Sequence, residues 1–287
     1  MKALVAGAGG QLGSALAETA PPGVEVRAFA RTDLDITDAA AVEEMVRRES
    51  PALIVNAAAY TAVDKAESEA DKAFAINRDG AAHLARTAAA AGARLVHVST
   101  DFVFDGRSGR PWRPDDPTGP LNVYGASKLA GEASVRAAGG KALIVRTAWV
   151  YAHRGANFLL TMLRVLKERG EARVVADQVG APTSALSLAR GLWRLATGDV
   201  VGVLHLTDAG VASWYDFAQA IAEEAQAAGF LAGAVKVIPI ASGDWPSAAV
   251  RPAFSVLDCA AAWPLIGGPP PHWRIALREV LARVPRS

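Results

Sequence analysis

The chain has very little cysteine, since Cys259 is its one cysteine among 287 residues. A framework of internal disulfide bonds is therefore excluded, and a reducing compartment such as the cytoplasm is expected. The sequence also lacks any run of about 18 apolar residues, which a membrane-spanning helix needs. The short apolar start, MKALVAG, passes directly into glycines. This pattern predicts a first strand and not a signal peptide.

An excess of charge of either sign is absent as well. The 30 Lys and Arg residues balance 29 Asp and Glu residues, which leaves a formal net charge of +1. Such a balance provides neither a basic field for nucleic acid nor an acidic tail. The chain instead has 51% hydrophobic residues, ample for a large buried core. We therefore expect a globular protein that acts on a small molecule, with no nucleic-acid or membrane partner.

Short apolar strands alternate with alanine-rich helices through the first half of the chain. Segments such as LIVN and VHVS show little apolar–polar alternation, which is typical of strands covered on both faces. Repeated strand–helix–strand units predict an α/β fold of the Rossmann type, with a doubly wound parallel sheet. The predicted strands are 3–6, 24–30, 53–56, 95–99 and 142–146, and the predicted helices are 11–19, 39–48, 70–91 and 123–138.

The second half of the chain is less regular, and from Pro239 it is rich in Pro, Gly and Trp, which predicts an irregular tail over a site. No flexible linker is evident, so we expect a smaller α/β substrate domain interleaved with the first. The dinucleotide-binding domain is predicted over 1–149 plus about 184–208, and the substrate domain over about 150–183 plus 209–287. Further predicted helices are 157–169, 186–196 and 214–228, and further predicted strands are 172–176 and 203–207.

A glycine-rich turn follows the first strand, with Gly7, Gly10 and Gly13 in the spacing G-x-x-G-x-x-G. Glycine adopts the angles of a tight turn at little cost, and its missing side chain lets a pyrophosphate approach the amides of a helix N-terminus. Leu12 stands where the pattern G-x-G-x-x-G has its last glycine. A turn without a ligand is the alternative, but the position directly after an apolar strand favours dinucleotide binding.

The choice of dinucleotide is predicted from the end of the second strand. An acidic residue there would bind the 2′-hydroxyl of NAD, but this chain has Arg31 and Thr32. Arg31 can pair with a 2′-phosphate through two hydrogen bonds. Asp35 is instead a candidate for the adenine side. We therefore expect NADP(H), with NAD(H) as the alternative.

The segment Y-G-A-S-K places Tyr124 and Lys128 four residues apart, on one face of a helix. A free tyrosine has a pKa of about 10. A neighbouring ammonium group lowers that pKa, which would make Tyr124 a proton donor near neutral pH. The fourth strand ends in Ser99, Thr100 and Asp101, at the edge where such sheets bind ligands. A hydroxyl there can hydrogen-bond a carbonyl oxygen that is being reduced.

The glycine turn, the Tyr–Lys pair and the upstream hydroxyl together resemble the extended short-chain dehydrogenases/reductases. Longer blocks resemble the dTDP-4-dehydrorhamnose reductases within them. The resemblance implies that NADPH or NADH reduces the 4-keto group of dTDP-4-dehydro-L-rhamnose to give dTDP-L-rhamnose, for polysaccharide synthesis. The blocks are VNAAAYTAVDKAE (55–67), STDFVFDG (99–106), PLNVYGASKLAGE (120–132), RTAWVYA (146–152), DQVGAPT (177–183) and RPAFSVLD (251–258).

The same resemblance implies roles for individual residues. Tyr124 would give the proton, Thr100 would steady the oxygen, and Lys128 would hold the cofactor. Trp149 would pack on the sugar ring, with a core position as the alternative. The implied cofactor contacts are Gly10, Gln11 and Leu12 at the pyrophosphate, Asp35 and Ile36 at the adenine, Ala59, Tyr60 and Thr61 at the ribose and phosphates, and Val98 at the nicotinamide. The implied substrate contacts are Thr100, Asp101, Trp149, Asn157, Gln178, Thr183 and Arg251, with Arg251 on the pyrophosphate.

One departure from the family concerns Mg²⁺, which some members bind at a dimer interface through two acidic residues. This chain has Ala15 and Leu186 at those places, and aliphatic side chains cannot ligate a hard cation. We therefore expect no such metal site, and either a monomer or a dimer that no metal bridges.

Two other functions stay open. A nucleotide-sugar epimerase or dehydratase has the same scaffold, but a dehydratase needs an acidic pair beside the catalytic hydroxyl, and Asp101 is followed by Phe102. A non-catalytic regulatory subunit that resembles the reductase is the second alternative. The intact Tyr124, Lys128 and Thr100 favour an enzyme.

Overall fold

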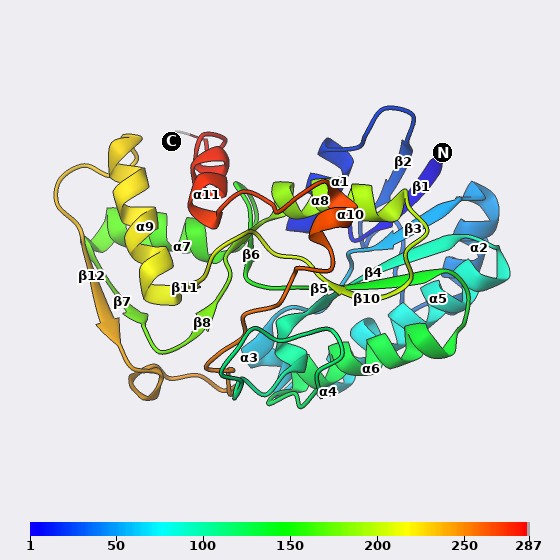
Figure 1. The fold of residues 1–287 in the computed structure, drawn as a ribbon, viewed down its shortest axis with the longest axis horizontal. Helices are drawn as coiled ribbons and strands as arrows, with labels where there is room; N and C mark the ends of the chain where they lie inside the picture. The colour runs from blue at the N-terminus through cyan, green and yellow to red at the C-terminus, as the bar shows by residue number, and fades with distance from the viewer. Residues whose placement is uncertain (286–287) are drawn as a thin grey trace.

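The computed structural model describes residues 1–285, and a parallel sheet of six strands lies at its centre (Figure 1). The strand order reverses between the first and third strands, at the switch point where such sheets bind ligands. This arrangement confirms the predicted α/β, doubly wound fold. In spatial order the strands are β10 (Gly202–His205), β5 (Ala142–Thr147), β4 (Arg94–Thr100), β3 (Leu53–Asn56), β1 (Lys2–Ala6) and β2 (Glu25–Phe29).

Burial explains why the sheet strands lack alternation. All four residues of β3 are buried, and so are four of the five residues of β1. By contrast, β2 lies at the edge of the sheet and is mostly exposed, so its sequence EVRAF carries charges. Central strands are covered by helices on both faces and have no polar side.

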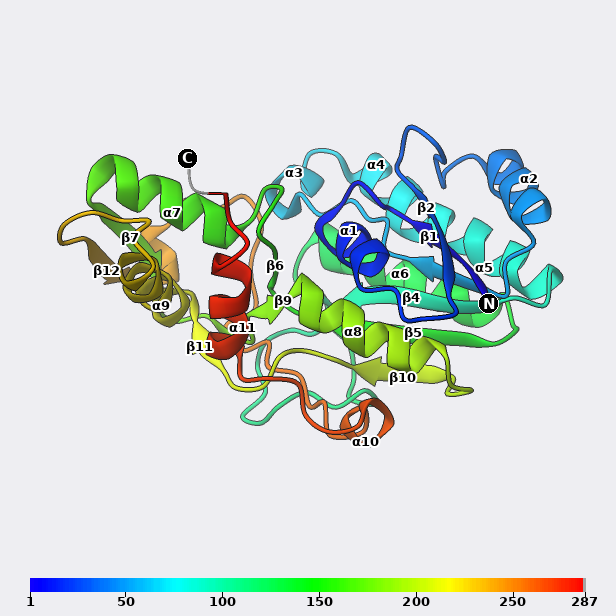
Figure 2. The ribbon, with the colours of Figure 1, turned by 90° about the horizontal axis from the view of Figure 1, so that it is seen from above.

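Helices cover both faces of the sheet (Figures 1 and 2). On one face, α1 (Gln11–Glu18) and α8 (Ala185–Ala196) pack together. On the other face lie α2 (Ala39–Glu49), α5 (Ala81–Ala90) and α6 (Val123–Ala137). Side-chain caps begin three of these helices, because Asp38, Asn122 and Ser184 accept hydrogen bonds from the first turns of α2, α6 and α8.

The predicted helix over 70–91 is interrupted by a π-helical turn. The structure divides this segment into α4 (Ala70–Phe74), a π turn (Ala75–Gly80) and α5, after a short α3 (Val63–Ala66). The turn packs closely against α6, where a Cβ on Gly131 would lie 2.1 Å from the carbonyl oxygen of Asn77. Such turns often occur at functional sites.

A second group of elements, the small lobe, has its own core. It contains β7 (Glu171–Val175) paired in parallel with β12 (Lys236–Ile240), and the helices α7 (Phe158–Arg169), α9 (Trp214–Ala227) and α11 (Trp273–Leu281). Phe217 lies at its centre and is completely buried. Two short strand pairs join it to the rest of the chain: β6 (Val150–Tyr151) with β9 (Thr183–Ser184), and β8 (Val179–Gly180) with β11 (Ala212–Ser213).

The prediction of an irregular tail from Pro239 was wrong in part. Pro239 itself lies in β12, and α10 (Trp263–Ile266) and α11 follow. Buried residues of α11 recur at helical spacing, from Trp273 to Leu281. That apolar period was the available signal, and the many Pro, Gly and Trp residues obscured it. Within residues 1–285, no helix has both the length and the apolar character that crossing a membrane requires.

Candidate active site

The turn after β1 packs too closely against its own backbone and the chain after β3 for side chains at Gly7 and Gly13. Gly7 has a φ of +88°, and a Cβ on it would lie 2.6 Å from the Ala58 amide nitrogen. A Cβ on Gly13 would lie 2.1 Å from the Gly7 carbonyl oxygen. Gly10 is the N-cap of α1 and brings no side chain, while the Leu12 side chain packs into the core. The bare helix N-terminus fits a dinucleotide pyrophosphate.

Gln11 and Asn157 connect this turn to the small lobe. Asn157 is the N-cap of α7 and accepts from Leu160 N at 3.1 Å. Its amide nitrogen donates to the side-chain oxygen of Gln11 at 3.0 Å. The same nitrogen also donates to the Ala152 carbonyl oxygen at 2.9 Å. Asn157, predicted as a substrate contact, is thus occupied in capping α7 and in holding the cofactor turn.

Arg31 and Asp35 lie together just beyond the end of β2. The Arg31 guanidinium is 3.4 Å from the Asp35 carboxylate, and two-thirds of its side chain is exposed. Thr37 donates to Asp35 from both its amide and its hydroxyl. These bonds lower the pKa of Asp35. Because most of its side chain is exposed, Arg31 remains open to a phosphate. Ile36, the other predicted adenine contact, is buried and lies against Gly80 of the π turn.

The segment Ala59–Tyr60–Thr61 is held by Asn77, which the sequence-based prediction missed. The Tyr60 amide donates to Asn77 Oδ1 at 2.8 Å, and Asn77 Nδ2 donates to the Tyr60 carbonyl at 3.1 Å. Asn77 also donates to the Ser127 hydroxyl at 2.9 Å. Since Ser127 lies in α6, the π turn joins the predicted ribose segment to the helix that carries Tyr124. A lone Asn inside a helical pattern carried no signal for this role.

Tyr124 lies in the first turn of α6, close to Thr100 at the end of β4. Burial raises the pKa of the phenol to about 12, the negative charge of Asp101 adds to this, and a hydrogen bond with Thr100 opposes it. The prediction that Lys128 lowers this pKa is therefore wrong for this structure. The Lys128 ammonium points instead at the Val98 carbonyl oxygen, 2.7 Å away. Tyr124 is fully protonated near neutral pH, which is the state that a proton donor needs.

Lys128 and Asp101 are buried charges within the same site. Burial lowers the pKa of Lys128 to about 8, although the carboxylate of Glu132 opposes the change. Burial raises the pKa of Asp101 to about 6, against hydrogen bonds from Ser255 and Thr100. Such shifts are characteristic of functional sites.

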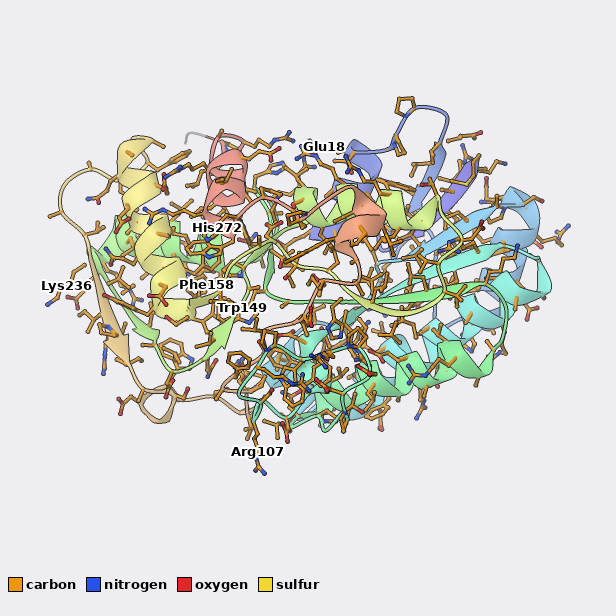
Figure 3. All side chains as sticks on the ribbon, in the orientation of Figure 1. Glu18, Arg107, Trp149, Phe158, Lys236 and His272 are labelled. Atoms are coloured by element: carbon orange, nitrogen blue, oxygen red, sulfur yellow. The ribbon has the colours of Figure 1, made fainter. Side chains whose placement is uncertain are left out.

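Trp149 lies between the sheet and the small lobe (Figure 3). It adopts a φ of +47°, which is rare for a side chain of this size. Its ring stacks on Trp214 of α9 with centroids 3.6 Å apart. Gly180 leaves no space beside the ring, because a Cβ there would lie 2.5 Å from Trp149 Cε2. Trp149 is half-buried and so is not a core residue of the sheet.

The remaining predicted substrate residues have partners within the chain. Arg251 forms an ion pair with Asp64 at 2.7 Å. Gln178 donates to the Ser242 hydroxyl at 2.9 Å. Thr183 is fully buried and donates to the Ala181 carbonyl at 3.0 Å, so its hydroxyl faces inward.

The two positions considered for Mg²⁺ are both buried. Ala15 and Leu186 pack in the core between α1 and α8. Across residues 1–285, no group of three or more His, Cys, Asp or Glu side chains is placed to hold a metal ion.

Comparison with known proteins adds to this geometry. The family model described as the RmlD substrate binding domain matches residues 1–286. The chain belongs to this family. It is 45% identical to the dTDP-4-dehydrorhamnose reductase of Mycobacterium tuberculosis strain H37Rv, over 97% of this chain and 92% of the relative. It is 40% identical to the spore coat polysaccharide biosynthesis protein SpsK of Bacillus subtilis, over 98% and 96%.

Solved structures of the family superpose closely on this one. The dTDP-4-dehydrorhamnose reductase of Bacillus anthracis, solved in complex with NADP, has a TM-score of 0.92 at 37% identity, with 98% of both chains covered. A Clostridium acetobutylicum member of the family has the same TM-score at 40% identity, over 98% of this chain and 99% of that one. A UDP-glucose 4-epimerase of Thermus thermophilus, at 19% identity, has a TM-score of 0.80 over 99% of both chains. It shares the fold alone.

Proposed function

We propose that this chain is an NADPH-dependent reductase that converts dTDP-4-dehydro-L-rhamnose to dTDP-L-rhamnose, in the synthesis of activated rhamnose for polysaccharide. The observation that carries the proposal is the buried group of Tyr124, Lys128 and Thr100 at the carboxyl edge of the sheet. The relatives named as this reductase, and the NADP complex of one of them, support the substrate and the cofactor. NADH is the alternative cofactor.

The residues of the site divide the work of reduction. A bound nicotinamide supplies the hydride for C4 of the keto sugar. Tyr124 gives its phenolic proton to the oxygen as negative charge develops there, and Thr100 hydrogen-bonds the same oxygen. Lys128, whose ammonium is held at the Val98 carbonyl, is placed beside the reacting groups, where it would hold the cofactor. The proton must then be restored to Tyr124 from solvent before the next turnover.

The proposal assigns the two parts of the chain different ligands. Residues 1–149 plus about 184–208 bind the dinucleotide, with Gly7, Gly10, Gln11, Leu12 and Gly13 at its pyrophosphate. Residues from about 150 to 183 plus 209–287 bind the nucleotide sugar, with Arg251 on its diphosphate. Trp149, the last residue of the 1–149 stretch, packs on the sugar ring. The enzyme works in the cytoplasm, as a monomer or as a dimer without a bridging metal.

NADPH oxidation in the presence of dTDP-4-dehydro-L-rhamnose tests the proposal, with Tyr124→Phe beside the wild type. We expect sugar-dependent oxidation by the wild type and at least about a hundredfold loss in the variant, since general acid catalysis contributes about 10²–10⁴-fold. NADPH binding should persist in Tyr124→Phe. Wild-type protein that binds NADPH but never oxidises it with the sugar would instead support a non-catalytic binding subunit. Activity with a different keto sugar would correct the substrate.

A further inference from the structure

A fully buried ion pair lies directly behind the Tyr124–Lys128 pair. The Glu132 carboxylate is completely buried, and the Arg146 guanidinium binds it through two hydrogen bonds of 2.8 Å each. The Ser99 hydroxyl donates to the same carboxylate at 2.6 Å. The catalytic scheme above uses none of these three residues. Buried ion pairs contribute little net stability, so stability alone does not account for this one.

The position of Glu132 relates it to the proposed catalytic residues. Tyr124, Lys128 and Glu132 follow one another at intervals of four residues, so they share one face of α6. Ser99 lies in β4 between Val98, whose carbonyl accepts from Lys128, and Thr100, which bonds the phenol. Glu132 therefore binds Ser99, the residue of β4 that lies between the contact of Lys128 with Val98 and the contact of Tyr124 with Thr100.

Arg146, the ion-pair partner of Glu132, is also held in a fixed position. Arg146 lies in β5 directly beside Ser99 in the register of the sheet. Its guanidinium donates to the Pro114 carbonyl at 3.1 Å and lies 5.1 Å from the centre of the Phe104 ring. Glu132 thus ties α6 to two neighbouring strands at the edge where the ligands bind.

The charge of Glu132 also affects Lys128. It opposes the effect of burial and so raises the pKa of the ammonium. The other ionisable groups around this position are Asp101 after β4, Arg146 of β5, Arg136 of α6, His97 of β4 and His205 of β10. The His205 ring lies 3.5 Å from the Arg146 guanidinium, and burial lowers its pKa to about 4. Burial and the charge of Lys128 lower the pKa of His97 well below its usual value, so His97 is neutral at neutral pH.

We propose that Glu132 is a positioning residue for the reaction: through Ser99 it sets α6 against the end of β4, and through Arg146 it ties that helix to β5. This inference rests on the proposed function, since it concerns the same Tyr124–Lys128 pair. It assigns Glu132 no contact with substrate or cofactor.

Glu132→Gln tests the inference, because the amide keeps the shape and removes the charge. We expect kcat to fall about tenfold or more, because small misplacements of catalytic groups are costly. The KM for the sugar should be unchanged, and the alkaline limb of the kcat profile should move to lower pH. Arg136→Gln is the matched control, since Arg136 is an exposed partner of the same carboxylate, 3.3 Å away. It should retain the wild-type kcat and pH profile.

Ser99→Ala provides a second variant, because Glu132→Gln leaves the Arg146 charge buried with a weaker partner and can fail to fold. Ser99→Ala keeps both charges and should lower kcat without moving the alkaline limb. A folded Glu132→Gln with the wild-type kcat and pH profile would overturn the inference. If Glu132→Gln does not fold, a Ser99→Ala variant with the full wild-type kcat would overturn the inference instead. An Arg136→Gln variant that loses as much activity as Glu132→Gln would also overturn it.

NADPH binding separates this inference from the proposed function. Without any sugar, NADPH fluorescence reports affinity as a function of pH, and Lys128 is a predicted cofactor contact. The alkaline loss of affinity should occur at lower pH in Glu132→Gln than in the wild type. That shift would support the role of Glu132 even if the wild type failed to reduce the sugar, and its absence would count against the charge effect in either case.

Discussion

The guanidinium of Arg251 forms a bidentate ion pair with the carboxylate of Asp64, with two nitrogen–oxygen distances of 2.7 and 3.1 Å. Asp64 belongs to α3, beside the sheet, whereas Arg251 lies in the segment after β12. The Ala249 amide and the Ser247 hydroxyl also donate to Asp64. These contacts lower the pKa of Asp64 well below its usual value. The pair thus fastens the 247–251 segment to α3 and orients the fork of Arg251, which matches a diphosphate as well as a carboxylate.

Removing the Arg251 fork should weaken binding of the nucleotide sugar. We expect Arg251→Ala to raise the KM for the sugar about tenfold or more, because hydrogen bonds to charged groups contribute about 1.5–3 kcal/mol. The dissociation constant of NADPH should not change. Steady-state kinetics and NADPH fluorescence measure the two quantities. Arg110→Ala is the control, since Arg110 forms a comparable bidentate pair with Asp116. An unchanged KM in Arg251→Ala would show that Arg251 only fastens its segment.

Arg31 should decide between the two dinucleotides. Its side chain is two-thirds exposed, and the neighbouring Asp35 is occupied by Thr37. We expect Arg31→Ala to raise the dissociation constant of NADPH about tenfold or more, since it loses a charge-assisted contact with the 2′-phosphate. NADH binding should change little. Arg47→Ala is the control, because Arg47 is an exposed arginine of α2. Equal weakening of both dinucleotides would contradict a 2′-phosphate contact.

Much of the fold was predictable because the sheet strands are buried on both faces. Where short apolar segments such as LIVN and VHVS alternate with helices along the chain, they indicate the central strands of a parallel sheet. The small lobe was harder, since β12 pairs with β7 across about 60 residues of sequence and no local pattern indicates such a partner. The helix α11 was missed although its apolar period is strong.

The candidate site was predictable where short motifs carry the chemistry. The glycine turn and the Tyr124–Lys128 pair have fixed spacings along the chain, and the structure brings Tyr124, Lys128 and Thr100 together. The protonation of Tyr124 was not predictable, because it depends on burial and on the orientation of Lys128. Asn77 and Asp64 were missed for another reason, since each acts on a partner distant in sequence.

Gly180 should be required for the position of Trp149. A Cβ at 2.5 Å from the indole must displace the ring, whose other neighbour is Trp214. We expect Gly180→Ala to raise the KM for the sugar several-fold, with NADPH affinity unchanged, and to alter the near-ultraviolet circular dichroism of the stacked pair. Gly109→Ala is the matched control, because a Cβ at Gly109 meets nothing within 4 Å. If Gly180→Ala kept both the spectrum and the KM, the packing argument for Trp149 would fail.

Asp208 should make the stability of the fold depend on pH. It follows β10, where its carboxylate accepts hydrogen bonds from the Ser184 amide at 2.8 Å and from the Ser187 hydroxyl. These donors belong to the start of α8, so Asp208 joins that helix to the chain after β10. Burial nevertheless raises the pKa of Asp208 from 3.8 to about 7, against those hydrogen bonds.

Because the folded state holds this proton more tightly than the unfolded chain, stability is greatest at low pH within this window. It is lost as the pH rises from about 4 to about 7, by up to about 1.4 kcal/mol per pH unit. Asp208→Asn cannot titrate, so the melting temperature of the wild type relative to this variant should fall between pH 4 and pH 7. Scanning calorimetry at several pH values measures the difference. The melting temperature of Asp115→Asn, a control variant at an exposed site, should change with pH in parallel with that of the wild type. A constant difference between wild type and Asp208→Asn would mean that Asp208 is ionised throughout, with its charge compensated by the two serines and the N-terminus of α8.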